Sequence, residues 1–292
     1  MAENILSKGT LFPAEVVTEM FNKVKGKSSL AVLSNQMPIA FNGNDIFVFS
    51  MDDEVALVGE NEAKSAGRVT LAPVKVVPIK VEYGARVSDE FLYATEEKKL
   101  EILKAFSEGF AAKVARGLDI MAFHGVNPRT GTASDLISHS FDKGTNTVTY
   151  AEANCDDNVD DAIKLIGDYD VTGIAMSKTF AAAMGKLENA QGGKLYPELK
   201  WGGQPGAVNG VKASVNSTVD FGTSKDMAIV GDFASCFKWG YAKQIPLQVI
   251  PYGDPDNTGK DLSGHNQVYL RAETYLGWGI LDQDAFARVV TA

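Results

Sequence analysis

The sequence predicts an α+β fold that combines a long helix, a pair of long strands and a smaller layer of alternating helices and strands. Residues 96–124 carry apolar side chains at steps of three and four, which predicts one helix well above the usual length. Residues 46–87 alternate apolar and polar side chains, as extended chain does. Residues 150–236 alternate short helical and short extended patterns, which indicates a separate α/β layer.

The first 45 residues predict an arm. One short amphipathic helix is expected after Pro13, where four apolar residues recur near helical spacing: Val16, Val17, Met20 and Val24. The chain around this helix is rich in Gly, Ser and Asn and cannot form a core alone. We therefore expect the arm to lie on another surface.

Two extended limbs flank the stretch GENEAKSAG at residues 59–67. In the second limb, 68–88, alternation predicts an apolar face (Ile79, Val81, Tyr83, Ala85, Val87) and a solvated face (Lys80, Glu82, Gly84, Arg86). Fully extended, this limb would span roughly 65 Å. Pro73 and Pro78 cannot donate to a strand ladder, so the limb is expected at an edge or loosely paired. The pattern predicts a protruding two-stranded arm with GENEAKSAG near its turn.

The long helix has clear ends. Thr95 is the expected N-cap, Glu96 and Glu97 lie in the first turn, and Gly125 is the expected stop. One apolar stripe runs along it: Leu103, Phe106, Phe110, Val114, Leu118 and Met121. Such a helix is about 43 Å long and is expected to act as a spine on which other elements pack.

Beyond the spine, helices are predicted over 158–166 and 178–192, and strands over 171–177, 210–219 and 227–242. Residues 245–280 predict two more extended limbs around a polar loop. The tryptophans Trp201, Trp239 and Trp278 are too far apart to form a stacking platform, so they are interpreted as core residues.

Composition and motifs argue against several functions. The formal charge of -9 over 292 residues disfavours a surface that neutralises phosphates. Cys155 and Cys236 lack metal or redox spacing, and His124, His139 and His265 fit no metal motif. The acids at 156–161 lack the calcium-loop spacing and suit a helix N-terminus. No cofactor, metal, secretion signal or membrane span is expected, so synthesis inside a cell is expected.

Glu60 and Glu62 raise the alternative of a hydrolase. A catalytic carboxylate pair needs a shaped cleft and an apolar pocket that raises the pKa of its acid. The polar and small neighbours in GENEAKSAG offer no such pocket, so a contact surface is the favoured interpretation. Extended parts that cannot pack on their own chain usually pack on neighbouring copies.

Several stretches, taken in order, resemble the major capsid proteins of tailed phages, of the Hong Kong 97 type. They are VALVGENEAKSAGRVTLAPVKVVPIKVEYGARVSDEFL, LDIMAFHGVNPRTGTASDLI, VNGVKASVNSTV, AIVGDFASCFKW and VYLRAETYLGWGILDQDAFARV, the last with Ala285 and Phe286. The resemblance extends from about residue 10 to the end. It implies the Hong Kong 97-type capsid fold. The first half of the chain would then hold an N-terminal arm (1–45), an extended loop (46–87) and a spine helix with the first part of a peripheral domain (88–150). The second half would hold an axial domain (151–236), the second peripheral part (237–276) and a return to the axial domain (277–292).

The resemblance also implies function and partners. The expected protein is no enzyme: it self-assembles, as pentamers and hexamers, into the icosahedral head shell of a tailed double-stranded DNA phage. It would be made in the host bacterial cytoplasm, reside in the virion, and enclose DNA without sequence-specific binding or a membrane. Because the arm begins almost at Met1, the resemblance implies a separate scaffolding protein, a chain already processed or a chain built without a scaffolding segment. A portal and a decoration protein are the other expected partners. An encapsulin-like shell is the alternative, against which TLFPAEVVTEM counts.

Two sets of site residues follow from the resemblance. Glu60, Glu62, Lys64 and Arg68 are candidates for contact between subunits at the loop. Some relatives join a loop Lys to an Asn of a neighbour with a Glu as proton acceptor, for which Lys64, Asn266 and Glu273 are the candidates here. Ordinary surface contacts remain the favoured role of Lys64.

Overall fold

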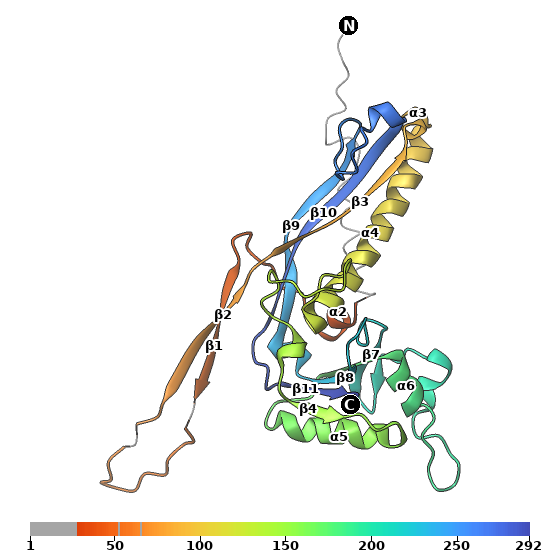
Figure 1. Ribbon diagram of the computed structural model, residues 1–292. Helices are drawn as coiled ribbons and strands as arrows, with labels where there is room; N and C mark the ends of the chain where they lie inside the picture. The colour runs from red at the N-terminus through yellow and green to blue at the C-terminus, as the bar shows by residue number, and fades with distance from the viewer. Residues whose placement is uncertain (1–27, 52, 65) are drawn as a thin grey trace.

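The computed structural model describes residues 28–51, 53–64 and 66–292. It contains three sheets, of two, three and six strands. In Figure 1 the two-stranded sheet is a projecting hairpin and the three-stranded sheet runs along a long helix to form an elongated body. The six-stranded sheet lies near the C-terminal end of that helix. The helix expected after Pro13 lies outside the described residues.

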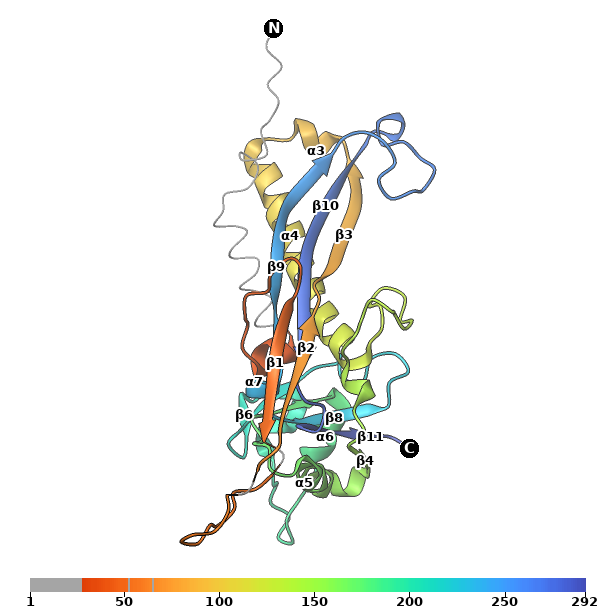
Figure 2. The same cartoon turned by 90° about the vertical axis from the view of Figure 1, so that its left-hand side faces the viewer.

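The hairpin consists of β1 (Asn44–Met51) and β2 (Val69–Val76), paired antiparallel along their whole length. It projects away from the rest of the molecule in Figure 1; in Figure 2 it faces the viewer, and its loop extends past the six-stranded sheet. The predicted single limb of residues 68–88 is wrong as one strand, because it breaks at Val77 and Pro78 and continues as β3 (Ile79–Ser88). β3 pairs with β10, so the segment 46–87 divides between two sheets.

The second sheet has the order β3-β10-β9 and carries the long helix alongside (Figure 1). β9 spans Phe237–Ile250 and β10 spans Gln267–Ile280, which confirms the two limbs expected there. Before the helix, α3 spans Glu90–Tyr93; after β9, the 3-10 helix η4 spans Ser263–His265. This sheet and the long helix form the elongated body.

The predicted spine helix is confirmed as α4, Glu96–His124, of 29 residues. The Thr95 side chain accepts a hydrogen bond from the Lys98 amide, and Gly125 ends the helix in the left-handed conformation at φ 64. The predicted stripe is buried except for Phe106, which is half-buried against the same core. No described helix is long and apolar enough to cross a membrane.

The two faces of β3 differ from the expectation at one end. Ile79 and Val81 pack on the main core, as predicted. On the opposite face, Gly84 and Arg86 are half-buried instead of solvated. The loop between β9 and β10 folds over Arg86, whose Nη2 donates to Asp254 Oδ1 at 2.7 Å.

The six-stranded sheet has the order β4-β11-β8-β5-β7-β6. Its strands are β4 (Thr147–Thr149), β5 (Gly173–Met176), β6 (Ala207–Val208), β7 (Val211–Val215), β8 (Asp226–Gly231) and β11 (Phe286–Val290). Its helices are α5 (Cys155–Ile166) and α6 (Lys178–Met184), with 3-10 turns η1 (Phe141–Lys143), η2 (Glu152–Asn154) and η3 (Pro197–Gly202). The first described helix, α2 (Ser29–Leu33), packs between α4 and this sheet.

In this layer, one predicted helix ends earlier than expected and one predicted strand is interrupted. The helix expected over 178–192 stops at Met184, and the Asn189 side chain accepts hydrogen bonds from the Gln191 and Gly193 amides, which stabilises a turn. The strand expected over 227–242 is divided by α7 (Phe233–Cys236), because the Asp232 carboxylate accepts from the Ser235 amide and caps a helical turn.

An aromatic cluster joins the body to the six-stranded sheet. The ring of Phe141 lies 4.9–5.8 Å from four others, on α4, α7, β9 and β11: Phe123, Phe233, Phe237 and Phe286. Trp239 and Trp278 are buried as predicted. Trp201 is not, being 97% exposed in η3, where it adopts φ 56. The core prediction for Trp201 is therefore wrong.

Candidate interaction surface

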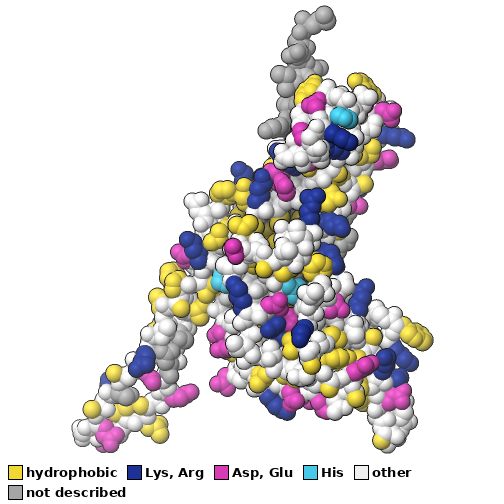
Figure 3. Space-filling view, viewed as in Figure 1, with side chains coloured by type: hydrophobic (Ala, Val, Ile, Leu, Met, Phe, Trp, Pro, Cys, Tyr) yellow, Lys and Arg dark blue, Asp and Glu magenta, His cyan; other side chains and the backbone are white. Residues whose placement is uncertain are grey.

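One face of the β1–β2 hairpin is apolar and uncovered. The register places three apolar pairs directly opposite one another on this face: Phe47 with Pro73, Phe49 with Leu71, and Met51 with Val69. Residues two apart on a strand point to the same side, so the six side chains form one continuous stripe. We call these six residues the hairpin stripe. Figure 3 shows apolar side chains along the hairpin.

The stripe is exposed far more than a core face would be. Phe47, Phe49 and Met51 are 63%, 58% and 76% exposed. On the opposite face, Ile46, Val48 and Val74 are half-buried, and only Thr70 and Ala72 near the outer end of β2 are exposed among its described side chains. An uninterrupted apolar surface on a projecting element is typical of a protein–protein contact.

The predicted contact residues Glu60, Glu62, Lys64 and Arg68 all lie in or beside the loop that closes the hairpin, and all are exposed. Glu62 is used locally, because its Oε2 accepts a hydrogen bond from the Gly59 amide at 3.0 Å. The Arg68 amide donates to Asp53 Oδ2 at 2.7 Å and so closes the base of the loop. The structure thus places the four charges at the outer end of the stripe.

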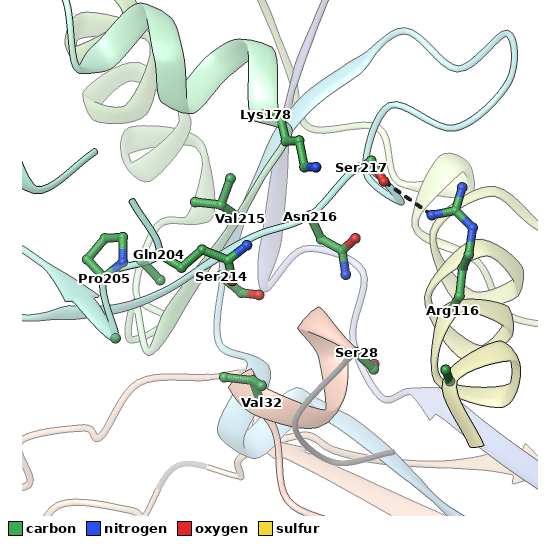
Figure 4. A pocket seen from close by; sticks show the side chains of 13 residues that line it. Ser28, Val32, Arg116, Lys178, Gln204, Pro205, Ser214, Val215, Asn216 and Ser217 are labelled. Atoms are coloured by element: carbon green, nitrogen blue, oxygen red, sulfur yellow. Dashed lines mark hydrogen bonds between the residues drawn. The ribbon is translucent and has the colours of Figure 1, made fainter. Parts of the chain in front are cut away.

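Among the described residues, the loop residues Glu60 and Glu62 are exposed and do not line the pocket shown in Figure 4. This pocket lies elsewhere, between α2, α4, α6 and β7. Its 13 lining residues include Arg116, which donates to Ser217 Oγ at 3.2 Å, and Lys178. They include no Asp, Glu, His or Cys. Neither the pocket nor the pair Glu60 and Glu62 offers the acid and base that hydrolysis needs.

The cross-link candidates are far apart within one chain. Lys64 lies in the hairpin loop, whereas Asn266 follows η4 at the far end of the body. Glu273 lies seven residues further along β10, roughly 23 Å away at strand spacing, and is buried in an ion pair with Lys80 at 2.8 Å. Bond formation would therefore require several chains.

Sequence reasoning missed two features. It did not identify the hairpin stripe, although apolar residues alternate at 47, 49 and 51 and at 69 and 71. It also treated His124 as isolated, whereas the structure places its Nδ1 3.5 Å from Asp142 Oδ2. No spacing in the sequence indicates the second feature, because its residues come from separate elements.

Comparisons with known proteins agree with this architecture. The sequence model of the phage capsid family matches residues 8–291. A protein of Mycobacterium phage Ogopogo is 34% identical, with 91% of this chain and 92% of that chain covered and a TM-score of 0.79. A protein of Gordonia phage Cozz is 25% identical, with coverages of 91% and 87% and a TM-score of 0.75.

A more distant structure shares the fold. A chain of the capsid of a native GTA particle is 17% identical, with 90% of both chains covered and a TM-score of 0.65. No curated protein matches the chain.

Proposed function

Because the chain belongs to the phage capsid family and is a major capsid protein of an icosahedral head shell, a structural protein and not an enzyme, we propose that its β1–β2 hairpin docks on a neighbouring copy through the hairpin stripe. The observation that carries this proposal is the row of six exposed apolar side chains on one face of a projecting hairpin. Burying apolar surface contributes roughly 25 cal/mol per Å² to the free energy of association. The described part of the chain leaves these side chains exposed, so a neighbouring copy can supply this burial.

The charged loop selects the neighbour in this arrangement. Glu60, Glu62, Lys64 and Arg68 lie where the hairpin ends, so they reach furthest from their own subunit. Exposed charges contribute little stability but strongly penalise a wrong register through like-charge contact. The stripe thus provides affinity, and the loop charges provide register.

The assembly proposed here has the division of parts that the sequence predicts. Residues 1–45 serve as the arm, 46–76 as the extended loop, and the body and six-stranded sheet as peripheral and axial domains that meet in pentamers and hexamers. β2 ends at Val76, so the proposed extended loop is shorter than the predicted 46–87. Lys64, Asn266 and Glu273 remain candidates for a bond between chains.

The partners are proposed from charge and family. The net charge of -9 suits a wall that confines double-stranded DNA without binding it tightly. A scaffolding protein, a portal and a decoration protein complete the proposed assembly, which starts in the host cytoplasm. The family match favours a phage shell over the encapsulin-like alternative and over a hydrolase.

Site-specific photocrosslinking tests the docking. A photoreactive amino acid at Phe49, on the stripe, should give covalent dimers in assembled particles. The same amino acid at Val48, on the opposite face of the same strand, is the matched control and should give few. Absence of dimers from Phe49 in intact particles would contradict the proposed docking.

A further inference from the structure

Three ligand-type side chains meet where α4 ends. His124 Nδ1 lies 3.5 Å from Asp142 Oδ2 and 3.8 Å from Asp226 Oδ2, and one ligand atom from each of the three side chains lies within 4.8 Å of the other two. His124 is the last residue of α4, Asp142 lies in η1 and Asp226 begins β8. We call these three residues the junction cluster.

The histidine presents a lone pair to the carboxylates. His124 Nε2 lies 2.8 Å from the Thr218 carbonyl oxygen, which only accepts, so Nε2 carries the hydrogen. In the neutral ring, Nδ1 is then the unprotonated nitrogen. Nδ1 and Asp226 Oδ2 are both without a hydrogen-bond partner, although the two side chains are only 3% and 1% exposed.

The spacing suits ligands of one ion better than hydrogen bonds. A charge-assisted N–H···O bond brings its heavy atoms to about 2.7–2.9 Å, which both separations from Nδ1 exceed. Ligand atoms about 2.1 Å from a tetrahedral Zn²⁺ ion lie about 3.4 Å from one another. The observed 3.5 and 3.8 Å are close to that value.

Arg288 holds the two carboxylates in this orientation. Its Nη1 donates to Asp142 Oδ1 at 3.1 Å and to Asp226 Oδ1 at 3.0 Å. Each aspartate therefore has one oxygen fixed by the guanidinium and the other directed at His124. Metal ligands are usually oriented by such outer hydrogen bonds, here from Arg288 to the aspartates and from His124 to Thr218.

We propose that the junction cluster binds one divalent transition-metal ion, for which Zn²⁺ is the best match. One imidazole nitrogen and two carboxylate oxygens are donors that Zn²⁺ accepts, whereas Ca²⁺ and Mg²⁺ prefer oxygen alone. When the imidazole is neutral and both aspartates are ionised, the two carboxylates and the Arg288 guanidinium carry one net negative charge, which the ion would balance in place of a proton. Asp142 is 37% exposed, so solvent and the ion reach the cluster there, and water completes the coordination.

The ion would connect the spine to the axial layer. It joins the C-terminal end of α4 to η1 and to β8 of the six-stranded sheet, and through Arg288 to β11. A ligand that binds only the folded chain raises its stability by mass action. The bound ion therefore holds the angle between helix and sheet and stabilises the subunit.

Metal titration of the full-length, chelator-treated chain tests the proposal. Isothermal titration with Zn²⁺ should show one site per chain, and a thermal melt with Zn²⁺ present should show a raised midpoint of unfolding. Co²⁺ in place of Zn²⁺ should give the visible absorption of a four-coordinate site. His124→Gln should abolish both signals; Asp142→Asn, which alters a part-exposed group and is expected to fold, should weaken binding by about tenfold or more.

The other histidines provide matched controls. His139→Gln and His265→Gln remove imidazoles outside the junction cluster and should leave the stoichiometry and the cobalt spectrum unchanged. Two results would overturn the proposal. One is Zn²⁺ binding that is equal in the wild type and in both folded variants, Asp142→Asn and His124→Gln. The other is an imidazole NMR spectrum that shows His124 protonated at Nδ1 at neutral pH in excess Zn²⁺.

Discussion

The Asp119 carboxylate, on α4, accepts a 2.5 Å hydrogen bond from the Ser28 hydroxyl, at the point where the N-terminal segment meets the spine. The Ser29 amide donates to the same carboxylate at 2.9 Å, and Thr218 Oγ1 also donates at 2.9 Å. One fully buried acid thus joins α2, α4 and the chain that follows β7. Because it satisfies amides at the start of α2, it fixes the position of α2 against α4.

Stability should depend on pH through Asp119. Burial raises the pKa of its carboxyl to about 6, against the partial opposition of its hydrogen bonds. The folded chain then binds more protons than the unfolded chain between about pH 4 and pH 6, so this contribution is present below pH 4 and lost as pH rises. From pH 4 to above pH 6, the free energy of unfolding of the wild type should fall by about 3 kcal/mol relative to that of Asp119→Asn. Urea unfolding of the unassembled chain at several pH values measures this, and a constant difference would contradict it.

Gly240 is required by a close approach of two backbones. A Cβ at this position would overlap the carbonyl oxygen of Met37, whose amide donates to the Trp239 carbonyl at 2.8 Å. Gly240→Ala should therefore separate the segment before β1 from β9 and cost roughly 1–3 kcal/mol in the free energy of unfolding. Gly264→Ala, with only one atom near the added Cβ, at 3.8 Å, is the control and should change little.

The loop between β9 and β10 depends on Arg86. Its Nη2 donates to side chains of Asp254 and Thr258 and to the Lys260 carbonyl, while Nε donates to Asp256 Oδ2 at 2.9 Å. The hydrogen bond from Arg86 lowers the pKa of Asp256 to about 2. Arg86→Gln should loosen the loop and speed trypsin cleavage after Lys260. If the rate of cleavage after Lys260 is unchanged in Arg86→Gln, the loop keeps its conformation without Arg86, and the prediction is wrong. Cleavage at other sites serves as the control and should be equal in both proteins.

Charge reversal at the hairpin loop should affect assembly and not folding. Glu60→Lys places a cation near Lys64 and Arg68, so the charge pattern that selects the register on the neighbour would be reversed at this position. We expect fewer particles in sedimentation, with an unfolding transition equal to that of the wild type. Glu60→Gln separates loss of charge from reversal and should have the smaller effect.

The sequence predicts what local patterns determine. α4 agrees from cap to stop because Thr95, Gly125 and the stripe between them act within one helix. The break between β2 and β3 was missed because the pairing of β3 with β10 depends on a strand almost 200 residues away. The junction cluster was missed because its three residues lie on separate elements that come together only in the folded chain.

The candidate surface was predicted in part. The position of GENEAKSAG in the turn of a protruding strand pair agrees with the structure. Alternation at Phe47 and Phe49 reveals a face but not whether it is covered, since coverage depends on what the rest of the chain leaves free. The prediction of a buried Trp201 failed for a similar reason: whether the rest of the chain covers a turn residue cannot be seen from the local sequence, and the structure leaves Trp201 exposed.

Electron microscopy of particles formed by the Phe49→Asp variant tests the central claim most directly. The claim predicts that a charge on the hairpin stripe abolishes shells while the subunit stays folded, because the carboxylate would be buried unpaired against the neighbour. Thr70→Asp adds the same charge to the opposite face of the same hairpin and should still give shells. Normal shells from Phe49→Asp would contradict the docking of the stripe on a neighbouring copy.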